Sequence, residues 1–366
     1  MAYKPSSDKF LFVIANVLAI FGLLMVYSAS SVAASAKHDG LSSYYFIRQL
    51  IYATIGYGLM VILMNLDYHI WQHKKVIKVL LIVSVLGLLF VLTQPPIHHA
   101  RRWVRYDWAS FQPSEMAKLA IVIYFAAYLH QHEKEINDFK RRLLPCLLVL
   151  LLLAGLIAVE PDLGQAVCLI LIVAVLLFVA GLRWKFIVTA CLVGLPALVL
   201  AAILLPNRFE RILTFWDRSK NPLSSGWQIT QSLTAVGSGG LFGLGLGASK
   251  QKLFFLPEAH SDFIFAIVGE ELGLIGAVLV CLAFLFFFYR GIRIALKAPD
   301  RFGFHLALGI TLMVVMQAFI NVSMVLGMMP TKGIALPFIS QGGSSLLVNL
   351  MATGVLLNVS NHMERA

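Results

Sequence analysis

Long apolar stretches separated by short polar segments limit most strongly the folds open to this chain. Ten of them are long enough to cross a hydrocarbon core, which needs about 20 mostly apolar residues in a helix. They fall near 10–31, 46–66, 76–94, 113–130, 143–159, 162–181, 185–205, 262–289, 303–326 and 340–360. Helices pair their own backbone groups, as lipid requires. The sequence therefore predicts one all-α polytopic membrane domain over residues 1–366, with about ten transmembrane helices.

The composition supports a membrane setting and excludes other classes of protein. Of the 366 residues, 59% are hydrophobic and 13% are charged, whereas soluble domains are about half apolar and a quarter charged. The first apolar stretch is too long for a cleaved signal peptide, and further spans follow it. No Cys and His cluster has zinc-site spacing. The net charge is +11, but no basic and aromatic module accompanies it, so nucleic acid is excluded as a partner.

Orientation follows from the basic residues between the predicted spans. Placing both termini in the cytoplasm puts basic clusters such as residues 140–142 on the inner side. It also makes residues 206–261 one long outer loop. Arg101 and Arg102 then lie outside, where basic residues are disfavoured, and an anionic partner such as a lipid pyrophosphate would account for them. The alternative is that outer loops tolerate such charges without using them.

Asp262 lies where a polar outer segment, LPEAHS over 256–261, meets the apolar stretch FIFA over 263–266. A carboxylate at such a boundary loses part of its water, which favours its protonated form. An acid of that kind is suited to take a proton from a sugar hydroxyl. Asp262 is therefore the candidate catalytic base, acting on a lipid-linked substrate.

Further charged residues interrupt the apolar spans. Pro113 suits the first turn of a helix, and Glu115 and Lys118 are three residues apart on one face of that helix, so we expect them to pair. Pairing reduces the cost of burying either charge without removing it. Asp162 follows a very short turn before another span. Its type and position are also typical of a helix N-cap, which is the structural alternative to a role in the site.

Two segments rich in glycine predict irregular backbone. Residues 329–345, MPTKGIALPFISQGGSS, lie at the outer mouth of the last two spans, where irregular backbone is tolerated if it lines a cavity or is covered by protein. The run GSGGLFGLGLGA over 237–248 contains a formal match to the dinucleotide-binding fingerprint. That motif needs a preceding strand of a βαβ unit, which is missing here. A flexible segment that approaches its neighbours closely, beside a ligand groove, is the better interpretation.

Several motifs together resemble one family of bacterial cell-wall proteins, the SEDS family. The motifs are RRW (101–103), FQPSEMAK (111–118), EPDLG (160–164), QS (231–232), GSGG (237–240), LPEAHSDFIFA (256–266), PFIS (337–340) and GGSS (342–345). They occur in the family's order and extend over almost the whole chain. The motifs GEELG (269–273) and MPTKG (329–333) look more like the division branch and its sporulation relative than the elongation branch. Ser261 replaces the usual Thr, and Gln341 replaces a usual Tyr, which removes an aromatic face.

The resemblance implies a peptidoglycan glycosyltransferase that polymerises lipid II into glycan strands during cell division. The 4-hydroxyl of another lipid II, or of a glycan end, would attack the anomeric carbon of the muramyl sugar, invert it and release undecaprenyl pyrophosphate. Asp262 would be the catalytic base. The residues expected to bind substrate are Arg101, Arg102, Glu115, Lys118, Asp162, Gln231, Ser232, Glu258, His260, Lys332 and Ser344.

The resemblance also implies a location and partners. The protein would sit in the bacterial cytoplasmic (inner) membrane with its site on the outer face. Its partners would be a class B penicillin-binding transpeptidase with a single membrane span and other division or elongation proteins. The Leu- and Phe-rich stretch 276–288 is a candidate contact surface, with plain lipid contact as the alternative. No cofactor is required by the residues, although a divalent cation (Mg²⁺ or Mn²⁺) would assist the pyrophosphate.

Two other functions fit part of the sequence. A transporter that flips lipid-linked precursors would use Glu115, Lys118 and Asp162 to line its path, because ionisable residues within spans mark pathways as well as active sites. A structural scaffold for division proteins is the other alternative, but it gives no reason for Asp262. Polymer formation from lipid II, compared with flipping in vesicles, separates these functions.

Overall fold

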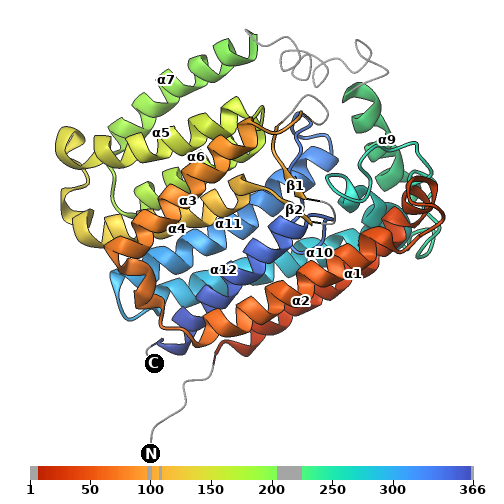
Figure 1. Ribbon diagram of the computed structural model, residues 1–366, viewed down its shortest axis with the longest axis horizontal. Helices are drawn as coiled ribbons and strands as arrows, with labels where there is room; N and C mark the ends of the chain where they lie inside the picture. Colours follow the sequence, from red (N-terminus) through yellow and green to blue (C-terminus); the bar gives the residue numbers. More distant parts are fainter. Residues whose placement is uncertain (1–6, 97–100, 107–108, 204–224, 364–366) are drawn as a thin grey trace, which may run out of the picture.

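The computed structural model describes residues 7–96, 101–106, 109–203 and 225–363. The long helices are α1 (Lys9–Lys37), α2 (Tyr44–Asn65), α3 (Lys74–Leu92), α4 (Pro113–His132), α5 (Leu144–Val159), α6 (Leu163–Val179), α7 (Trp184–Ile203), α9 (Ser225–Ser238), α10 (Ile264–Leu296), α11 (Arg301–Val325) and α12 (Gly343–Asn361) (Figure 1). The short helices are η1 (Tyr68–Gln72), η2 (Glu133–Glu135) and η3 (Phe139–Leu143). Strands β1 (Val104–Tyr106) and β2 (Ala109–Phe111) complete the described elements.

Every predicted apolar span coincides with one of these helices, so the all-α polytopic fold class is confirmed. Among the described residues, seven helical segments are long and apolar enough to cross a membrane by length and composition. They are Lys9–Lys37, Tyr44–Asn65, Lys74–Leu92, Phe139–Val159, Ile264–Leu296, Arg301–Val325 and Gly343–Asn361. Helix α6 is apolar but shorter.

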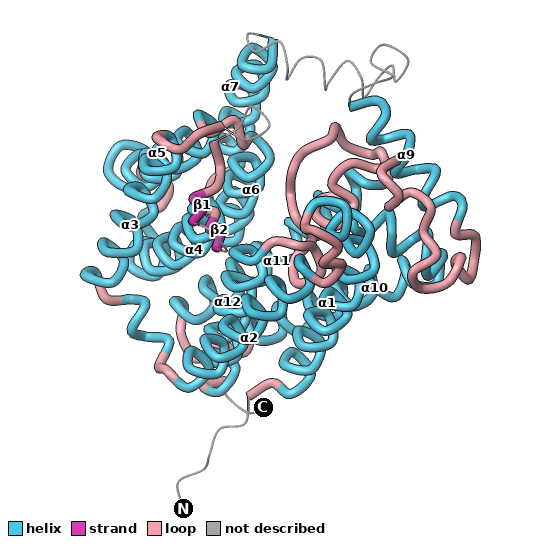
Figure 2. Tube along the Cα trace, turned by 45° about the vertical axis from the view of Figure 1, so that its right-hand side comes forward, coloured by secondary structure: helices cyan, strands magenta, loops and turns pink. Residues whose placement is uncertain are grey.

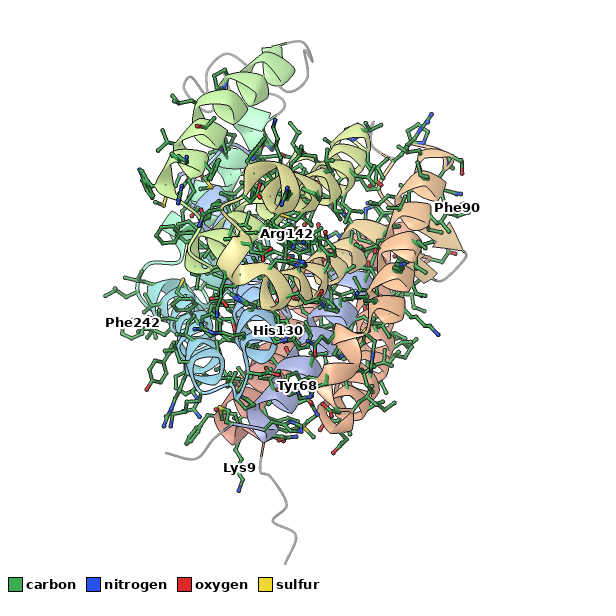
Figure 3. The ribbon with its side chains drawn as sticks, turned by 90° about the vertical axis from the view of Figure 1, so that its left-hand side faces the viewer. Lys9, Tyr68, Phe90, His130, Arg142 and Phe242 are labelled. Carbon is green, nitrogen blue, oxygen red and sulfur yellow. The ribbon has the colours of Figure 1, made fainter. Side chains whose placement is uncertain are left out.

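The start of α1 and the end of α12 lie on the same side of the bundle. The backbone N–H of Asp8, the N-cap of α1, donates to Ser360 Oγ near the end of α12 at 3.0 Å. Arg290, near the end of α10, forms an ion pair with the Asp8 carboxylate. Figure 3 shows Lys9 and Tyr68 toward this end of the molecule and Phe90, near the end of α3, toward the other. This arrangement agrees with the even number of crossings that the ten predicted spans would make.

Helices α11 and α12 form the centre of the bundle, and most of their residues are buried. Helix α12 packs on α2, and α11 packs on α4 and α10. Figure 2 shows α11 and α12 in the middle, with α3 to α6 on one side and α1 and α10 on the other. Gly354 permits the close contact of α12 with α2, since a Cβ there would lie 2.5 Å from the Met60 carbonyl oxygen.

The predicted long outer loop contains a helix, α9, and a glycine-rich segment that inserts into a break in α10. The break is at Gly273, whose φ of 68° is in the left-handed region. The N–H groups of Leu244 and Gly245 donate to the carbonyls of Glu270 and Glu271 at 3.0 Å. The segment therefore satisfies backbone groups that the interrupted helix leaves unpaired. Residues 206–224 of the loop lie outside the described residues.

A short antiparallel hairpin of β1 and β2 precedes α4 and was not predicted. Val104 pairs with Phe111, and Arg105 pairs with Ser110. The Tyr52 hydroxyl of α2 donates to the Ser110 carbonyl at 2.9 Å and accepts from the Ser110 N–H at 2.8 Å. This anchor fixes the hairpin on the bundle, and with it the segment that carries Arg102.

Candidate active site

Asp262 lies in the turn just before α10, and this turn is fixed to the irregular segment 331–342. Asn321 Nδ2 of α11 donates to the Asp262 carbonyl at 2.8 Å and to the Ile334 carbonyl at 2.7 Å. Ser340 Oγ donates to the Ser261 carbonyl at 2.6 Å. One buried amide and one hydroxyl thus hold two irregular segments together. The predicted irregular segment 329–345 is covered by protein, since none of its residues is exposed.

Arg102 and Asp262 meet at Gly333. Arg102 Nη1 and Asp262 Oδ2 each lie 3.1 Å from the position that a Cβ on Gly333 would occupy. Arg102 Nη2 donates to the Pro161 carbonyl, and its Nε is 3.7 Å from Asp162 Oδ2. The guanidinium therefore lies between two carboxylates, one from the start of α6 and one from the start of α10.

Asp162 is both the N-cap of α6 and a member of this group. Its Oδ1 accepts from the Gln165 N–H at 3.4 Å, which confirms the predicted capping position. Its Oδ2 accepts from Gln112 Nε2 at 3.1 Å. The Gln112 N–H in turn donates to Ser344 Oγ at 3.1 Å. All four side chains are buried, and the Ser344 hydroxyl holds the backbone of Gln112, while its substrate-binding role stays a prediction.

The predicted pair on α4 forms and is closed by two glutamines. Lys118 Nζ is 2.9 Å from Glu115 Oε2, and both side chains are fully buried. Lys118 also donates to Gln317 Oε1 at 2.5 Å, and Gln165 Nε2 donates to Glu115 Oε1 at 2.8 Å. Gln317 Nε2 continues to the Ala335 carbonyl at 2.9 Å. The buried pair thus supports the irregular segment near Asp262.

Lys332 lies beside the start of α6. Its Cβ would be 3.3 Å from a Cβ on Gly164. Burial lowers the pKa of Lys332, and the charge of nearby Asp162 partly opposes that shift. Lys332 is therefore a second cation, besides Arg102, near the Asp162 carboxylate.

Glu258 and His260 shape the turn that ends at Asp262. Glu258 has a φ of 55°, and its Oε2 accepts from Ser261 Oγ at 3.1 Å. The His260 ring stacks on Tyr45 of α2, with ring centroids 5.0 Å apart. Burial lowers the pKa of His260, so its ring is neutral at neutral pH. Their substrate-binding role stays a prediction, while their contacts give each a structural role.

The remaining predicted site residues are Arg101, Gln231 and Ser232. Arg101 is exposed and donates to the Leu92 carbonyl at 2.8 Å. Ser232 Oγ donates to the Val325 carbonyl of α11 at 2.7 Å and is buried. Gln231 is partly buried on α9. Their substrate-binding role stays a prediction, and the geometry favours Arg102 over its neighbour.

Sequence reasoning missed the amides that connect these segments, and it missed Glu160. Gln317 and Asn321 are single polar residues in an apolar helix, and such residues within spans mark sites or interhelical contacts. Glu160 is fully buried and stands two positions before the predicted Asp162. The close spacing of these two carboxyl residues was the sequence signal that could have identified Glu160.

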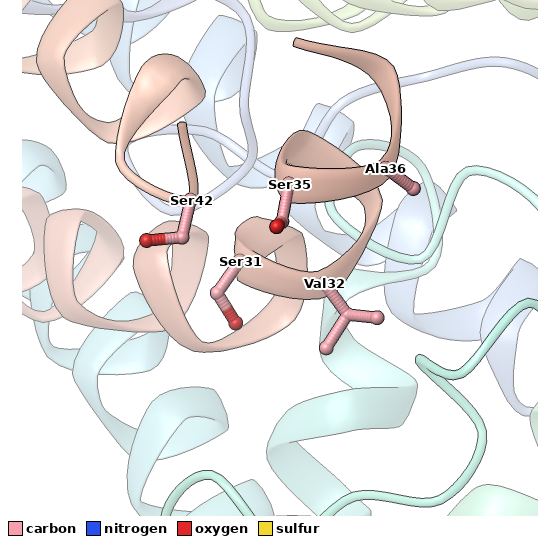
Figure 4. A pocket seen from close by; sticks show the side chains of 5 residues that line it. All are labelled: Ser31, Val32, Ser35, Ala36 and Ser42. Atoms are coloured by element: carbon pink, nitrogen blue, oxygen red, sulfur yellow. The ribbon is translucent and has the colours of Figure 1, made fainter. Parts of the chain in front are cut away.

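Neither a metal cluster nor a hollow identifies the site. In the described part of the chain, no group of three or more His, Cys, Asp and Glu side chains is arranged to hold a metal ion. A hollow of about 480 Å³ beside the end of α1 is lined by residues without ionisable side chains (Figure 4). They are Ser31, Val32, Ser35, Ala36 and Ser42. The charged residues around Asp262 are therefore the candidate site.

Known proteins match this chain over almost its full length. Residues 8–365 match FTSW_RODA_SPOVE, a family described as cell cycle protein. The probable peptidoglycan glycosyltransferase FtsW of Geobacter sp. strain M18 is 42% identical over 98% of both chains. Stage V sporulation protein E of Bacillus subtilis is 44% identical over 98% of both chains.

Solved structures agree in fold along the full length. The crystal structure of the rod shape determining protein RodA of Thermus thermophilus is 27% identical and superimposes with a TM-score of 0.72, covering 98% of both chains. A chain from a study of polymerisation and crosslinking by a peptidoglycan synthase complex gives a TM-score of 0.78 at 27% identity, covering 97% of both chains. These matches confirm the resemblance seen in the motifs. The chain belongs to the FtsW, RodA and SpoVE family of cell cycle proteins.

Proposed function

We propose that this protein is a peptidoglycan glycosyltransferase that polymerises lipid II into glycan strands during cell division. The names of the FtsW relatives, which match almost the full chain at about 40% identity, support the reaction class. The observation that carries the proposal is the meeting of Asp262 and Arg102 at Gly333. It combines a base with a cation, which are the two groups that this transfer needs.

In the proposed reaction, the acceptor 4-hydroxyl oxygen forms a bond to the anomeric carbon of the donor's muramyl sugar. The bond from that carbon to the pyrophosphate oxygen breaks, and its electron pair leaves with undecaprenyl pyrophosphate. Asp262 takes the hydroxyl proton. Arg102 offsets the charge that develops on the leaving group, since a guanidinium can bind two phosphate oxygens at once. A single displacement inverts the anomeric centre without a covalent sugar intermediate.

The buried contacts support this chemistry by fixing the geometry in advance. Asn321 holds the backbone of Asp262, and Asp162 holds one side of the Arg102 guanidinium. Charges that are already oriented in a region of little water act strongly on a developing charge and need no reorganisation. The Glu115 and Lys118 pair is closed by its own partners, which favours a supporting role over the polar path that a flippase would need.

We propose the bacterial inner membrane as the location, with both termini in the cytoplasm and the site on the outer face. The hydrogen bond between Asp8 and Ser360, which joins the start of α1 to the end of α12, supports termini on one side. The positive-inside rule supports the assignment of that side. The proposed partner is a class B penicillin-binding transpeptidase with one membrane span. Likeness to a chain of a peptidoglycan synthase complex and the exposed apolar face of α10 around Leu282 and Leu285 support it.

The test of this function is polymer formation by the purified protein. Protein in detergent is mixed with lipid II, with and without Mg²⁺ or Mn²⁺ and a candidate transpeptidase, and the glycan products are separated by length. Glycan polymer is the expected product. Flipping of lipid II across vesicles without any polymer under these conditions would instead support the transporter.

A further inference from the structure

Glu160 is a buried acid in the short turn between α5 and α6. Its side chain is 0% exposed, and neither carboxyl oxygen has a hydrogen-bond partner among the described residues. Its backbone N–H is used by the end of α5, donating to the Leu156 carbonyl at 3.2 Å. An ionised carboxylate without partners is one of the costliest groups to bury. The surroundings therefore favour the neutral acid.

Two charged groups act directly on Glu160. Asp162, on the same turn, repels a second negative charge, whereas Arg102, from the segment before β1, attracts one. Burial is the largest effect, and together these influences raise the pKa of Glu160 to about 8. The charges of Glu115 and Lys118 act on Asp162, and the charge of Asp162 acts on Lys332. These three residues therefore influence Glu160 by way of Asp162.

Arg102 is already committed to groups other than Glu160. Its guanidinium donates to the Pro161 carbonyl, lies beside Asp162 and reaches toward Asp262 at Gly333. A neutral Glu160 leaves this arrangement undisturbed. An ionised Glu160 would be a second carboxylate two residues from Asp162 and would compete for the same guanidinium.

We propose that Glu160 is a positioning residue that works as an uncharged acid, so that Arg102 stays directed at Asp262 and at the donor's pyrophosphate. This inference rests on the proposed function for its kinetic consequence only. Loss of the proton from Glu160 draws Arg102 away from the donor and adds a negative charge beside the pyrophosphate. Donor binding and turnover then decline as the pH rises through about 8.

The first test compares pH profiles of polymerisation from pH 6.5 to 9.5. Glu160→Gln keeps a neutral polar group of the same shape, so we expect it to retain turnover at pH 7 and to lose the decline near pH 8. Glu160→Ala removes the group and should lower turnover at every pH. Glu135→Gln makes the same chemical change at an exposed carboxylate on η2 and should leave the profile unchanged.

The second test needs no activity. A carboxyl whose pKa is higher in the folded than in the unfolded chain takes up a proton on folding, so stability falls as the pH rises between the two values, from about 4.3 to about 8. We expect Glu160→Gln to melt at a higher temperature than wild type, with a difference that grows from pH 5 to pH 8 and is constant above. Glu135→Gln should show no such trend.

The outcomes separate this inference from the proposed function. Absence of polymer from wild type, together with the expected melting pattern, would contradict the glycosyltransferase and leave the neutral state of Glu160 supported. A melting difference that does not depend on pH would overturn the inference. So would a folded Glu160→Gln protein that is inactive at every pH, or one whose profile superimposes on that of wild type.

Discussion

Arg102 Nη1 and Asp262 Oδ2 both lie against Gly333, each 3.1 Å from the place where a Cβ would be. The two residues are 160 positions apart in the chain and come from different segments. The absence of a side chain at 333 is therefore what lets the cation and the candidate base approach each other. The geometry makes Gly333 a sensitive position for the reaction.

Gly333→Ala should reduce polymerisation with little loss of stability. The added methyl group would be tight against both Arg102 and Asp262, so both groups would have to shift slightly, and small displacements of reacting groups lower the rate. Gly58→Ala, where a Cβ meets nothing within 4 Å, is the control. Wild-type turnover in the folded Gly333→Ala protein would contradict the approach of these residues in the working site.

Arg102 should matter for donor binding in the order Arg, Lys, Ala. Lysine keeps the charge but loses the planar group that binds two phosphate oxygens, and alanine loses both. Lipid II affinity and polymer yield should both fall along this series. Arg101→Ala should have a smaller effect, because that side chain contacts the end of α3. Equal losses at the two arginines, or none at either, would count against the assignment.

Glu115→Ala should be more harmful than the double change of Glu115→Ala with Lys118→Ala. The single change leaves a fully buried lysine without its acidic partner, and breaking such a pair costs about 3–5 kcal/mol. The measurement is a double-mutant cycle of thermal stability in detergent. Strictly additive effects would mean that the two charges are not coupled.

Gly243→Ala should destabilise the fold more than Gly240→Ala. Both glycines have a positive φ, so both substitutions strain the backbone by about 1–2 kcal/mol. Only at Gly243 would the new Cβ also collide, at 2.1 Å, with the Glu271 carbonyl of α10. The difference in melting temperature between the two variants isolates this contact. Equal melting temperatures would show that the glycine-rich segment does not pack into α10 as described.

Local patterns in the sequence predicted much of this structure. The length of the apolar stretches predicted the helices, because lipid permits few other structures that satisfy the backbone hydrogen-bonding groups. The three-residue spacing of Glu115 and Lys118 predicted their ion pair. The residue type and position of Asp162 predicted its role as a helix N-cap. Each of these depends on neighbours within one helical turn.

Contacts between distant segments were not predictable in this way. The insertion of Gly243 beside Gly273 and the amide of Asn321 between two turns depend on how helices pack. The isolation of Glu160 is likewise a property of its surroundings, since a glutamate in a short turn is normally solvated. The sequence named Asp262 and Arg102 separately, and only the fold brings them together.

Asp262→Asn removes the proposed base with the smallest change in shape. The amide is nearly isosteric with the carboxylate but cannot take the acceptor's proton, and loss of a positioned base costs about 10²–10⁴-fold. The measurement is polymer formed from purified lipid II by the variant, with its melting temperature as proof of folding. We expect a folded protein that makes almost no polymer. Polymer at close to the wild-type rate would contradict the assignment of Asp262 as the base.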